Sequence, residues 1–197
     1  HGVHWQHDGH WLFGSVDVAD EAGIEAAAGQ AYAGVFEALH TSGFAHLLRV
    51  WNYLPRINDE GDAMERYKLF NAGRQQAFLD AGEHAFEGAP AACAIGTAAG
   101  PLRVRFLAGR RAVRHVENPR QVSAYRYPQR YGPRAPTFSR AALVEAGDGR
   151  LGLFISGTAS IVGHESVHPG DVRAQVRETV ANLRAVLDNA SSRCSVH

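Results

Sequence analysis

"GRLGLFISGTASIVGHESVHPGDVRAQVRETVANLRAVL", residues 149–187, is the stretch that decides the fold. An apolar run that predicts a strand leads through a glycine-rich loop into a helical pattern. One face of that helix is shared by Val172, Val176, Val180, Leu183 and Leu187. The same order occurs earlier, where "WLFGSV" (11–16) precedes a helical segment ending in "FEALHTSG" (36–43). The sequence therefore predicts two copies of one strand-to-helix unit.

Further strands and helices are predicted around these two copies. The buried stripe of the first helix consists of Ile24, Ala28, Ala31, Val35 and Leu39. Gly43 closes this helix. Asp62 and Glu65 form a capping box that opens a second helix over 63–82. Strands are predicted at 46–55, 138–146 and 150–160, with 90–96 and 101–109 as a strand pair.

The composition allows one hydrophobic core and gives the protein no overall electrostatic field. A chain of 197 residues with 45% hydrophobic content buries one good core but hardly two. The 20 basic and 20 acidic residues cancel, so no net charge attracts nucleic acid or an anionic membrane. No apolar run approaches the roughly 18 residues of a spanning helix, and the amino end lacks the apolar stretch of a signal peptide. We expect a soluble cytosolic protein with small-molecule partners.

Metal and disulfide chemistry are not predicted. The chain has 11 His but no H-E-x-x-H pattern. Its two Cys, Cys93 and Cys194, form no metal-ligand spacing and no obvious disulfide. We therefore expect no metal site.

Residues 149–187 resemble the opening signature of the RidA (YjgF) family. In that signature, a strand ending in Ser-Gly is followed by a Pro-Gly-Asp loop and a helix with Gln, Thr, Asn and Leu at regular intervals. Residues 11–115 resemble one full unit of this fold, and 120–197 resemble a partial second unit. The resemblance implies a single α+β domain over 1–197, with a mixed sheet packed by helices.

A narrower resemblance covers most of the chain. Four blocks in order are similar to the chorismatases: "VWNYLPRIND" (50–59), "ERYKLFNAGRQQAF" (65–78), "YRYPQRYGPRAPTFSRA" (125–141) and "FISGTASIVGHES" (154–166). These RidA-fold enzymes cleave chorismate into pyruvate and a six-membered ring acid without a cofactor. Better-known members are longer and carry an additional amino-terminal region, which we expect this chain to lack. Since RidA-fold domains leave an edge and a cleft for neighbours to complete, we expect a homo-oligomer, a trimer with sites at subunit boundaries.

One face of the second predicted helix mixes aromatic, amide and guanidinium groups, at Tyr67, Asn71, Arg74 and Phe78. A plain core helix would carry Leu or Ala there. Arg74 either reaches solvent, pairs with a local Glu, or binds an anion. The resemblance favours the anion and implies that Tyr67, Asn71 and Ala72 lie at the same site.

Residues 125–140 interleave aromatic and basic side chains without an acid: Tyr125, Arg126, Tyr127, Arg130, Tyr131, Arg134 and Arg140. Such a run is also typical of nucleic-acid binding, which the neutral net charge disfavours. Three prolines stiffen the segment, and fixed guanidinium groups suit a small dicarboxylate such as chorismate. We assign Arg134 and Arg140, with Arg74, to the carboxylates. Tyr127 and Tyr131 are assigned to substrate binding, and Arg126 and Arg130 to solvent.

Glu165 is the predicted catalytic acid. Cleaving an enol ether requires a proton on its terminal methylene carbon, so the site needs a carboxylic acid in a poorly solvated setting. By itself, a Glu before a helix more often favours the helix dipole. The resemblance to the family's catalytic glutamate reverses that preference. His164 and His168 are then orienting or surface groups.

Two other functions stay open. A RidA-type imine deaminase needs an arginine where Ala92 stands, which counts against it. A non-catalytic small-molecule-binding module is compatible with the basic loop alone.

Among the products of chorismate cleavage, 4-hydroxybenzoate is favoured over 3-hydroxybenzoate or a dihydroxycyclohexadiene acid. The residues that disfavour the 3-isomer are Ala72 and Thr158, the latter beside the substrate-binding Gly157, because the 3-hydroxybenzoate formers tend toward Gly and Cys at those two positions. The short chain departs from the long hydrolytic members, which disfavours the dihydroxycyclohexadiene acid.

Overall fold

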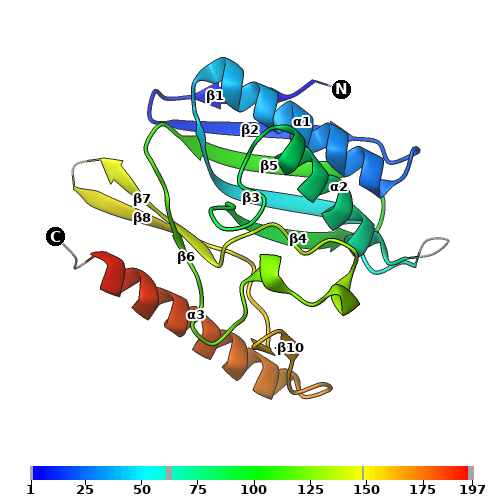
Figure 1. Ribbon diagram of the computed structural model, residues 1–197, viewed down its shortest axis with the longest axis vertical. Helices are drawn as coiled ribbons and strands as arrows, with labels where there is room; N and C mark the ends of the chain where they lie inside the picture. Colours follow the sequence, from blue (N-terminus) through cyan, green and yellow to red (C-terminus); the bar gives the residue numbers. More distant parts are fainter. Residues whose placement is uncertain (1, 61–63, 148, 195–197) are drawn as a thin grey trace.

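The computed structural model describes residues 2–60, 64–147 and 149–194, which form a mixed α+β fold (Figure 1). The larger sheet has five strands in the order β1-β2-β5-β3-β4, and the smaller has three in the order β6-β7-β8. In chain order the elements are β1 (His4–His7), β2 (Trp11–Val18), α1 (Ile24–Ser42), β3 (His46–Pro55), α2 (Arg66–Asp80), β4 (Ala91–Thr97), β5 (Leu102–Gly109), β6 (Arg114–Val116), the 3₁₀ turns η1 (Ala124–Arg126) and η2 (Gln129–Tyr131), β7 (Ala141–Gly147), β8 (Arg150–Ile155), β9 (Ile161–Val162), β10 (Glu165–Ser166) and α3 (Val172–Cys194).

Strand β3 lies between β4 and β5, which the sequence predicted to pair with each other. β3 pairs with β4 in parallel and with β5 in antiparallel fashion, so the predicted pairing was wrong. The reason is the crossover through α2, which returns the chain parallel to β3 on its outer edge. β5 then runs back between β3 and β2. β3, β4 and β5 themselves form within one residue of the predicted ends, whereas the strand predicted at 138–146 begins only at residue 141 and the one predicted at 150–160 already ends at residue 155.

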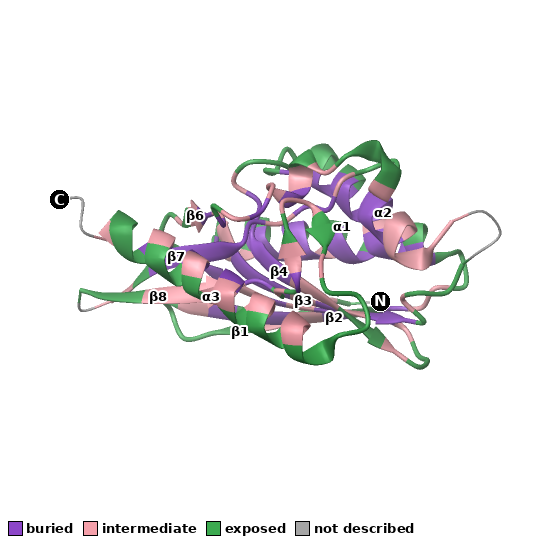
Figure 2. Ribbon diagram, turned by 90° about the horizontal axis from the view of Figure 1, so that it is seen from below, coloured by how far each residue is buried: buried purple, intermediate pink, exposed green. Residues whose placement is uncertain are grey.

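Helices α1 and α2 cover one face of the larger sheet, and Figure 2 shows their buried sides turned toward it. The predicted stripe of α1 is confirmed, since its five residues are all buried. Gly43 closes α1 at φ 71°, a left-handed conformation that glycine favours, and its N–H donates to the Leu39 carbonyl. The helices meet at Gly73, where a Cβ atom would collide with the backbone of Glu25.

Helix α2 begins later than its predicted capping box implies. Its first residue is Arg66, and its N-cap residue Glu65 makes no side-chain hydrogen bond to the helix. Asp62, the other half of the box, lies outside the described residues. The chain before the helix is bonded differently: Glu65 bridges Glu60, and the Arg66 N–H donates to the Asp59 carbonyl. These turn bonds replace the predicted first turn.

Two serines join the smaller sheet to the larger one. The Ser156 hydroxyl donates to the Ser139 carbonyl at 2.5 Å and accepts from the Ala92 N–H at 2.8 Å. Ala91 also forms a parallel bridge with Ser139. The end of β8 is therefore fixed against β4, and the loop after β8 leaves from the junction of the two sheets.

Helix α3 forms where predicted, but its shared apolar face is not its buried face. Val172, Val176, Val180 and Leu187 are exposed, and the buried residues are instead Asn182, Val186 and Ala190. The smaller sheet offers a narrow surface. The buried apolar residues through which α3 packs on this sheet are Val186 and Ala190. In Figure 2, α3 is intermediate or exposed along most of its length. None of the described helices is long and apolar enough to cross a lipid bilayer.

Candidate functional site

The loop after β8 folds into a tight hairpin that carries Glu165. β9 pairs antiparallel with β10, and Glu165 lies opposite Val162. Gly163 makes the turn between them at φ 61°. Its N–H donates to the Arg120 carbonyl at 2.9 Å, and its carbonyl accepts from the Val122 N–H at 2.8 Å. The chain after β6 therefore holds the hairpin and places Glu165 beside its turn.

Asn182 of α3 anchors the base of this hairpin. Its side chain is fully buried, and its amide nitrogen donates to the Ala159 carbonyl at 3.0 Å and the Ile161 carbonyl at 2.9 Å. Its amide oxygen accepts from the Arg120 guanidinium at 2.9 Å. Gln121 donates to the same Ile161 carbonyl at 3.0 Å. Buried polar groups that satisfy one another are costly to disrupt, so these bonds fix the loop conformation.

Arg120, Glu178 and His168 form a charged cluster beside this anchor. Arg120 makes an ion pair with Glu178, and His168 Nε2 lies 3.4 Å from Glu178 Oε2. The bonds from Arg120 and then from His168 hold the pKa of Glu178 below its ordinary value. His168 has φ 61°, which is uncommon for a residue other than glycine. The His168 side chain is 43% exposed beside Glu178, and its role as an orienting or a surface group stays a prediction.

Glu165 lies in a wetter and more charged setting than the sequence predicted. Its side chain is 66% exposed, and its Oε1 accepts from the Arg130 guanidinium at 2.9 Å. The predicted poorly solvated setting was therefore wrong for this chain by itself, because a two-residue strand leaves the side chain on the surface. Arg126 is exposed as predicted, whereas Arg130 is 56% exposed but bonded to the predicted acid.

Tyr127, Tyr131 and His164 form an aromatic cluster beside Glu165. His164 Nδ1 lies 3.2 Å from the Tyr131 hydroxyl and 3.1 Å from the Arg130 guanidinium. Ring centroids of Tyr127 and Tyr131 are 5.4 Å apart. The bonds from Tyr131 and then Glu165 raise the pKa of Arg130. The structure thus brings both predicted tyrosines to Glu165 and adds Arg130, which the sequence analysis assigned to solvent because its contact with Glu165 spans 35 residues of the chain.

Arg140 is buried behind these tyrosines. Its guanidinium donates to the Val122 carbonyl at 2.8 Å and to the Tyr127 hydroxyl at 3.1 Å. Its Nε has no hydrogen-bond partner in the part of the chain that the structure describes. Burial raises the pKa of the neighbouring Glu117, an effect that Ser123 and Arg140 oppose. Arg140 therefore orients Tyr127 and retains an unused donor.

Arg74 belongs to a second group of predicted residues, on α2. Its side chain is 2% exposed, and so are those of Asn71 and Phe78, while Tyr67 is partly buried, which confirms one buried face. The guanidinium lies 5.0 Å from the Phe70 ring centroid and donates to Asn71 Oδ1 at 3.0 Å. Within residues 2–60, 64–147 and 149–194, its Nε has no partner and no carboxylate forms an ion pair with it. The alternative of a local Glu partner was therefore wrong.

Tyr32 and Asn52 complete a polar network around Arg74. The Tyr32 hydroxyl donates to Asn52 Oδ1 at 2.8 Å, and the Asn52 amide donates to the Cys93 carbonyl at 2.9 Å. Burial raises the pKa of Tyr32, and the charge of Arg74 opposes this effect. Sequence reasoning missed both residues, although each is a polar residue at a core position of a predicted helix or strand.

The segment after η2 connects the two groups. Arg134 is exposed, and its guanidinium donates to Gln75 Oε1 at 3.2 Å and Gln76 Oε1 at 3.4 Å, both on α2. Gln75 in turn donates to the Ala135 carbonyl at 3.1 Å. The predicted site residues therefore form one group around Arg74 and another around Glu165, joined by residues 127–135.

The Ser-Gly-Thr end of β8 lies where the smaller sheet meets β4. The Gly157 N–H donates to the Ala92 carbonyl at 3.0 Å, and a Cβ atom on Gly157 would lie 3.0 Å from the Cβ of Cys93. The Thr158 hydroxyl donates to the carbonyl two residues before it at 2.9 Å. Ala72 is buried on α2. Gly157 is therefore a position of close approach between the sheets.

Arg49 is a further buried guanidinium that the sequence analysis missed. It is 8% exposed on β3, where its guanidinium lies 5.3 Å from the Trp51 ring centroid. Its Nη1 has no partner among the residues described. Burial lowers the pKa of Arg49, and the neighbouring Cys93 opposes this effect. The apolar run around it predicted a strand and gave no sign of a buried cation.

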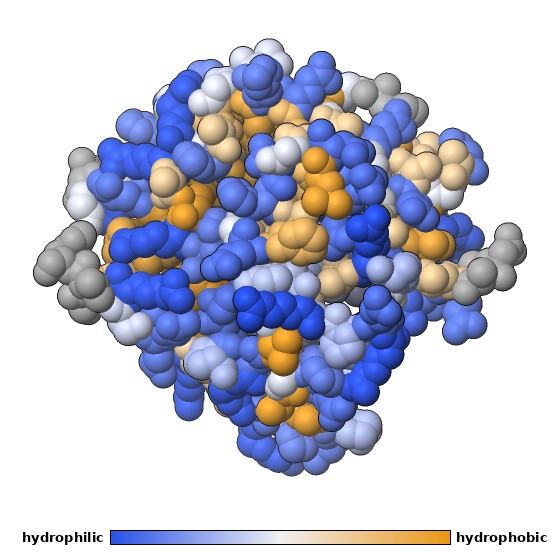
Figure 3. All heavy atoms as spheres, in the orientation of Figure 1, coloured by the Kyte–Doolittle hydropathy of each residue, from blue (hydrophilic) through white to orange (hydrophobic). Residues whose placement is uncertain are grey.

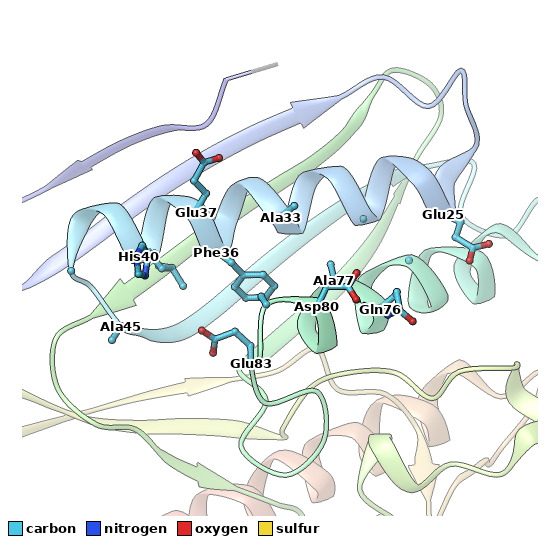
Figure 4. Close-up of a pocket in the computed structure, with 15 residues that line it drawn as sticks. Glu25, Ala33, Phe36, Glu37, His40, Ala45, Gln76, Ala77, Asp80 and Glu83 are labelled. Carbon is cyan, nitrogen blue, oxygen red and sulfur yellow. Dashed lines mark hydrogen bonds between the residues drawn. The ribbon is translucent and has the colours of Figure 1, made fainter.

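A groove of about 800 Å³ lies apart from these residues, between α1 and α2 (Figure 4). Its lining includes Glu25, Glu37, Asp80 and Glu83 and none of the predicted site residues. Four carboxylates would repel a dicarboxylate, so we assign this groove no part in substrate binding. Among the described residues, no group of three or more His, Cys, Asp and Glu side chains is placed to hold a metal ion.

Comparisons of this chain with known proteins all indicate the same family. Residues 1–108 match the family model described as "Chorismatase FkbO/Hyg5-like, N-terminal". A 3-hydroxybenzoate synthase from Streptomyces hygroscopicus is 40% identical over 195 residues, covering 96% of this chain and 57% of the relative. A chorismatase from Streptomyces rapamycinicus is 42% identical over 191 residues, covering 94% and 56%. The crystal structure of a chorismatase at 1.08 Å resolution matches with a TM-score of 0.91 and 36% identity, covering 97% of this chain and 58% of that one.

The relatives are longer than this chain, as predicted. The chain spans 57% of the 3-hydroxybenzoate synthase and 56% of the chorismatase from Streptomyces rapamycinicus. That their extra length is an amino-terminal region stays a prediction. The family model covers more than half of the chain, and the sequence and structural matches extend over nearly all of it. The chain therefore belongs to the chorismatase family.

Proposed function

We propose that this protein cleaves chorismate into pyruvate and a hydroxybenzoate without a cofactor. The observation that carries the proposal is Arg74, a guanidinium that is 2% exposed and whose Nε has no partner among the described residues. A buried cation is costly unless an anion compensates it, and a substrate carboxylate supplies that anion. Relatives named chorismatase and 3-hydroxybenzoate synthase support the same substrate.

In this proposal Glu165 is the general acid. Protonated Glu165 delivers its proton to the terminal methylene carbon of the enolpyruvyl group, which creates an oxocarbenium-like centre. The bond between the ring carbon and the ether oxygen then breaks, and the oxygen leaves with the side chain as pyruvate. The ring loses one proton and becomes aromatic. One proton enters and one leaves, so no water, oxidant or reductant is required.

In the proposed reaction, substrate binding must break the ion pair between Arg130 and Glu165. The Glu165 carboxyl accepts from the Arg130 guanidinium at 2.9 Å, whereas the proposed reaction needs this carboxyl to face the substrate. A substrate carboxylate that binds Arg130 would compete with Glu165 for it and would also displace water from the exposed hairpin. We therefore infer that substrate binding itself releases Glu165 from Arg130. Arg134 and Arg140 remain the predicted ligands of the carboxylates, with Tyr67, Asn71, Tyr127 and Tyr131 around the ring.

We infer 4-hydroxybenzoate as the product. Ala72 and Thr158 occupy the two positions that separate the product types in the resemblance described above. The relative named 3-hydroxybenzoate synthase favours the 3-isomer as the second candidate. Cleavage of the ring C–O bond leaves the existing ring hydroxyl in place and gives the 4-isomer, whereas the 3-isomer requires that hydroxyl oxygen to move to the neighbouring ring carbon, so the contacts of the ring hydroxyl decide between them.

Incubation of the purified protein with chorismate tests the proposal. Pyruvate is measured by a coupled dehydrogenase assay and the aromatic acid by chromatography against both hydroxybenzoates. We expect equimolar pyruvate and 4-hydroxybenzoate. Equimolar 3-hydroxybenzoate would correct the product and keep the reaction. Binding of chorismate without release of pyruvate would contradict the enzyme and favour the binding module.

The RidA-like fold and the trimer are also part of our proposal. Both halves of the chain contain an antiparallel hairpin followed by a helix, β1-β2-α1 and β7-β8-α3, which supports a duplicated RidA-like unit. A trimer would place a neighbouring copy near the exposed Glu165 hairpin. Light scattering at micromolar concentration checks this, and a monomer would contradict it.

A further inference from the structure

Glu117 and Arg140 bring a carboxyl group and a guanidinium group together below the surface. In the antiparallel ladder of β6 and β7, Val116 pairs with Ala141, so Glu117 and Arg140 follow as the next opposing positions. Arg140 is 5% exposed, and both carboxyl oxygens of Glu117 are buried. Charged side chains ordinarily lie on the surface, and hydrophilic residues cover much of the face in Figure 3. This buried pair therefore calls for a physical explanation.

Both groups have hydrogen-bonding capacity that the described chain does not use. Neither carboxyl oxygen of Glu117 has a hydrogen-bond partner among the described residues, and neither does Arg140 Nε. The bonds from Arg140 to the Val122 carbonyl and the Tyr127 hydroxyl both come from its Nη2 atom. Residues 2–60, 64–147 and 149–194 contain no ion pair between Glu117 and Arg140. Arg140 thus orients Tyr127 while it keeps a free donor.

Arg140 is the cation that acts on the Glu117 carboxyl. Burial raises the pKa of Glu117, and Ser123, Arg140 and Ser139 oppose this increase. From α3, the neutral amide of Asn189 donates to the Glu117 carbonyl at 2.6 Å. The charge of Glu117 therefore depends on the balance between its burial and the guanidinium of Arg140.

The other charged and titratable groups around β6 lie toward its first residues. The exposed Arg193 of α3 donates to the His115 carbonyl at 3.1 Å, and Arg114 donates to the Arg193 carbonyl at 3.0 Å. Burial lowers the pKa of His115, which favours its neutral form. These contacts involve backbone carbonyls and leave the Glu117 carboxyl to Arg140.

Arg140 connects Glu117 to the predicted substrate site. Its bond to the Tyr127 hydroxyl reaches the aromatic cluster, where the Tyr127 ring centroid is 5.4 Å from that of Tyr131 and 6.4 Å from that of His164. A substrate carboxylate at Arg140 would add a second negative charge beside a guanidinium that already balances Glu117. When two carboxylates share one poorly solvated place, protonation of one of them is favoured.

We propose that Glu117 is an internal counter-ion of Arg140, and that Glu117 takes up a proton from solvent when a substrate carboxylate replaces it there. The inference rests on the proposed function, because it takes Arg140 as a ligand of the substrate. Neutral Glu117 then leaves the full charge of Arg140 to the substrate. Since the bound state holds more protons than the free state, affinity for a dicarboxylate falls as the pH rises through this titration, by up to about tenfold per pH unit.

Titration calorimetry of the full chain with isophthalate measures the proton uptake. This dicarboxylate has no enol ether to cleave, and its carboxylates are largely ionised above about pH 5.5. Titrations in buffers of different ionisation enthalpy, from about pH 5.5 to 8, give the number of protons taken up per isophthalate. We expect wild type to take up as much as one proton. Glu117→Gln should take up none, and its affinity should not change with pH.

Three variants separate Glu117 from other groups that can bind a proton. Glu87→Gln removes an exposed carboxyl, Glu165→Gln the predicted acid, and His164→Gln the imidazole beside Tyr131. Each should keep the uptake of wild type. Uptake that persists in Glu117→Gln, or that disappears in Glu165→Gln or His164→Gln while binding persists, would overturn the proposal. So would a wild type that binds isophthalate without proton uptake, a result that requires no variant to fold.

Pyruvate release from chorismate distinguishes a failure of this inference from a failure of the proposed function. Proton uptake with isophthalate but no pyruvate from chorismate would contradict the reaction and support the counter-ion. Pyruvate release without proton uptake, or without any binding of isophthalate, would support the reaction and overturn the counter-ion.

Discussion

The first hairpin-and-helix unit of this chain buries its helix, whereas the second leaves much of its helix exposed. In the first, β1 and β2 lead to α1, whose apolar stripe from Ile24 to Leu39 is buried against the larger sheet and α2. In the second, β7 and β8 lead to α3, whose apolar stripe faces solvent. The core of the second unit consists of Val116, Ala141, Leu143, Val186 and Ala190. The same local pattern therefore yields a packed core only where strands and a second helix cover it.

The two units also differ in what they contribute to the proposed chemistry. The first provides a deeply buried cation, Arg74, in a rigid polar network with Tyr32 and Asn52. The second provides Glu165, on an exposed two-residue strand held by hydrogen bonds from Asn182. Sites with few buried apolar contacts open more readily than a core does. In the proposed site, the first unit would therefore supply a buried cation and the second an exposed acid.

The largest expected effect is on turnover, and it tests the role given to the second unit. Glu165→Gln preserves the shape of the side chain but cannot deliver a proton. General-acid catalysis contributes about 10²–10⁴ in rate, so turnover on chorismate should fall by at least that factor. Steady-state pyruvate release measures it. Binding of a non-reactive dicarboxylate should stay within a few-fold, and near-normal turnover would show that Glu165 is not the acid.

A pair of leucines compares the two stripes directly. Leu39 on α1 is 4% exposed, and Leu187 on α3 is 45% exposed. Leu39→Ala removes buried side-chain atoms and should lower the free energy of unfolding by about 2–5 kcal/mol. Leu187→Ala should cost less than about 0.5 kcal/mol in dilute protein. Urea unfolding at two protein concentrations checks both, and a cost of Leu187→Ala that grows with concentration would indicate that the stripe is covered in an assembly.

Lysine substitutions test how the carboxylate ligands are divided between the units. Arg74→Lys, Arg134→Lys and Arg140→Lys keep the charge but lose the planar guanidinium. Affinity for a non-reactive dicarboxylate should fall by about 1–3 kcal/mol in each, as measured by calorimetry. Arg126→Lys, at an exposed arginine, is the matched control and should change nothing. Equal affinities in all four variants would place the anion site elsewhere.

The smallest effect concerns pH and the buried carboxyl of the second unit. Burial raises the pKa of Glu117 above its ordinary value of 4.5. The native state therefore holds this proton more tightly than the unfolded chain, and the associated stability is lost as the pH rises from about 4.5 through the raised pKa. Over that pH range the wild type should lose stability and Glu117→Gln should not. The unfolding free energy of the variant minus that of the wild type should therefore grow as the pH rises.

Denaturation midpoints at several pH values measure this difference. Glu87→Gln, at an exposed glutamate, is the control for loss of a carboxyl group and should give no such trend. A difference between Glu117→Gln and wild type that shrinks with rising pH would show that the Glu117 carboxyl is better solvated than its neighbours in the structure imply.

The sequence predicted most elements of this fold, and the reason is that their signals are local. Alternation over 46–55 and the stripe from Ile24 to Leu39 report which side of each element is apolar, and both are confirmed. Gly43 ended α1 as predicted because only the backbone conformation of that residue matters there. The buried face of α2 was also predicted, since Asn71 and Arg74 fall at the spacing of one helical face.

Only the tertiary structure decided how segments that are distant in the sequence lie against one another. Periodicity shows that α3 has an apolar stripe, but whether that stripe is covered depends on how wide the neighbouring sheet is. Strand spacing cannot place β3 between β4 and β5, because that order follows from the crossover through α2. Arg130 reaches Glu165 only because the chain after β6 bonds to the turn at Gly163. Residue types and local patterns thus specify the parts and the candidate chemistry, while solvation of the acid and the partners of each charge arise from packing across the chain.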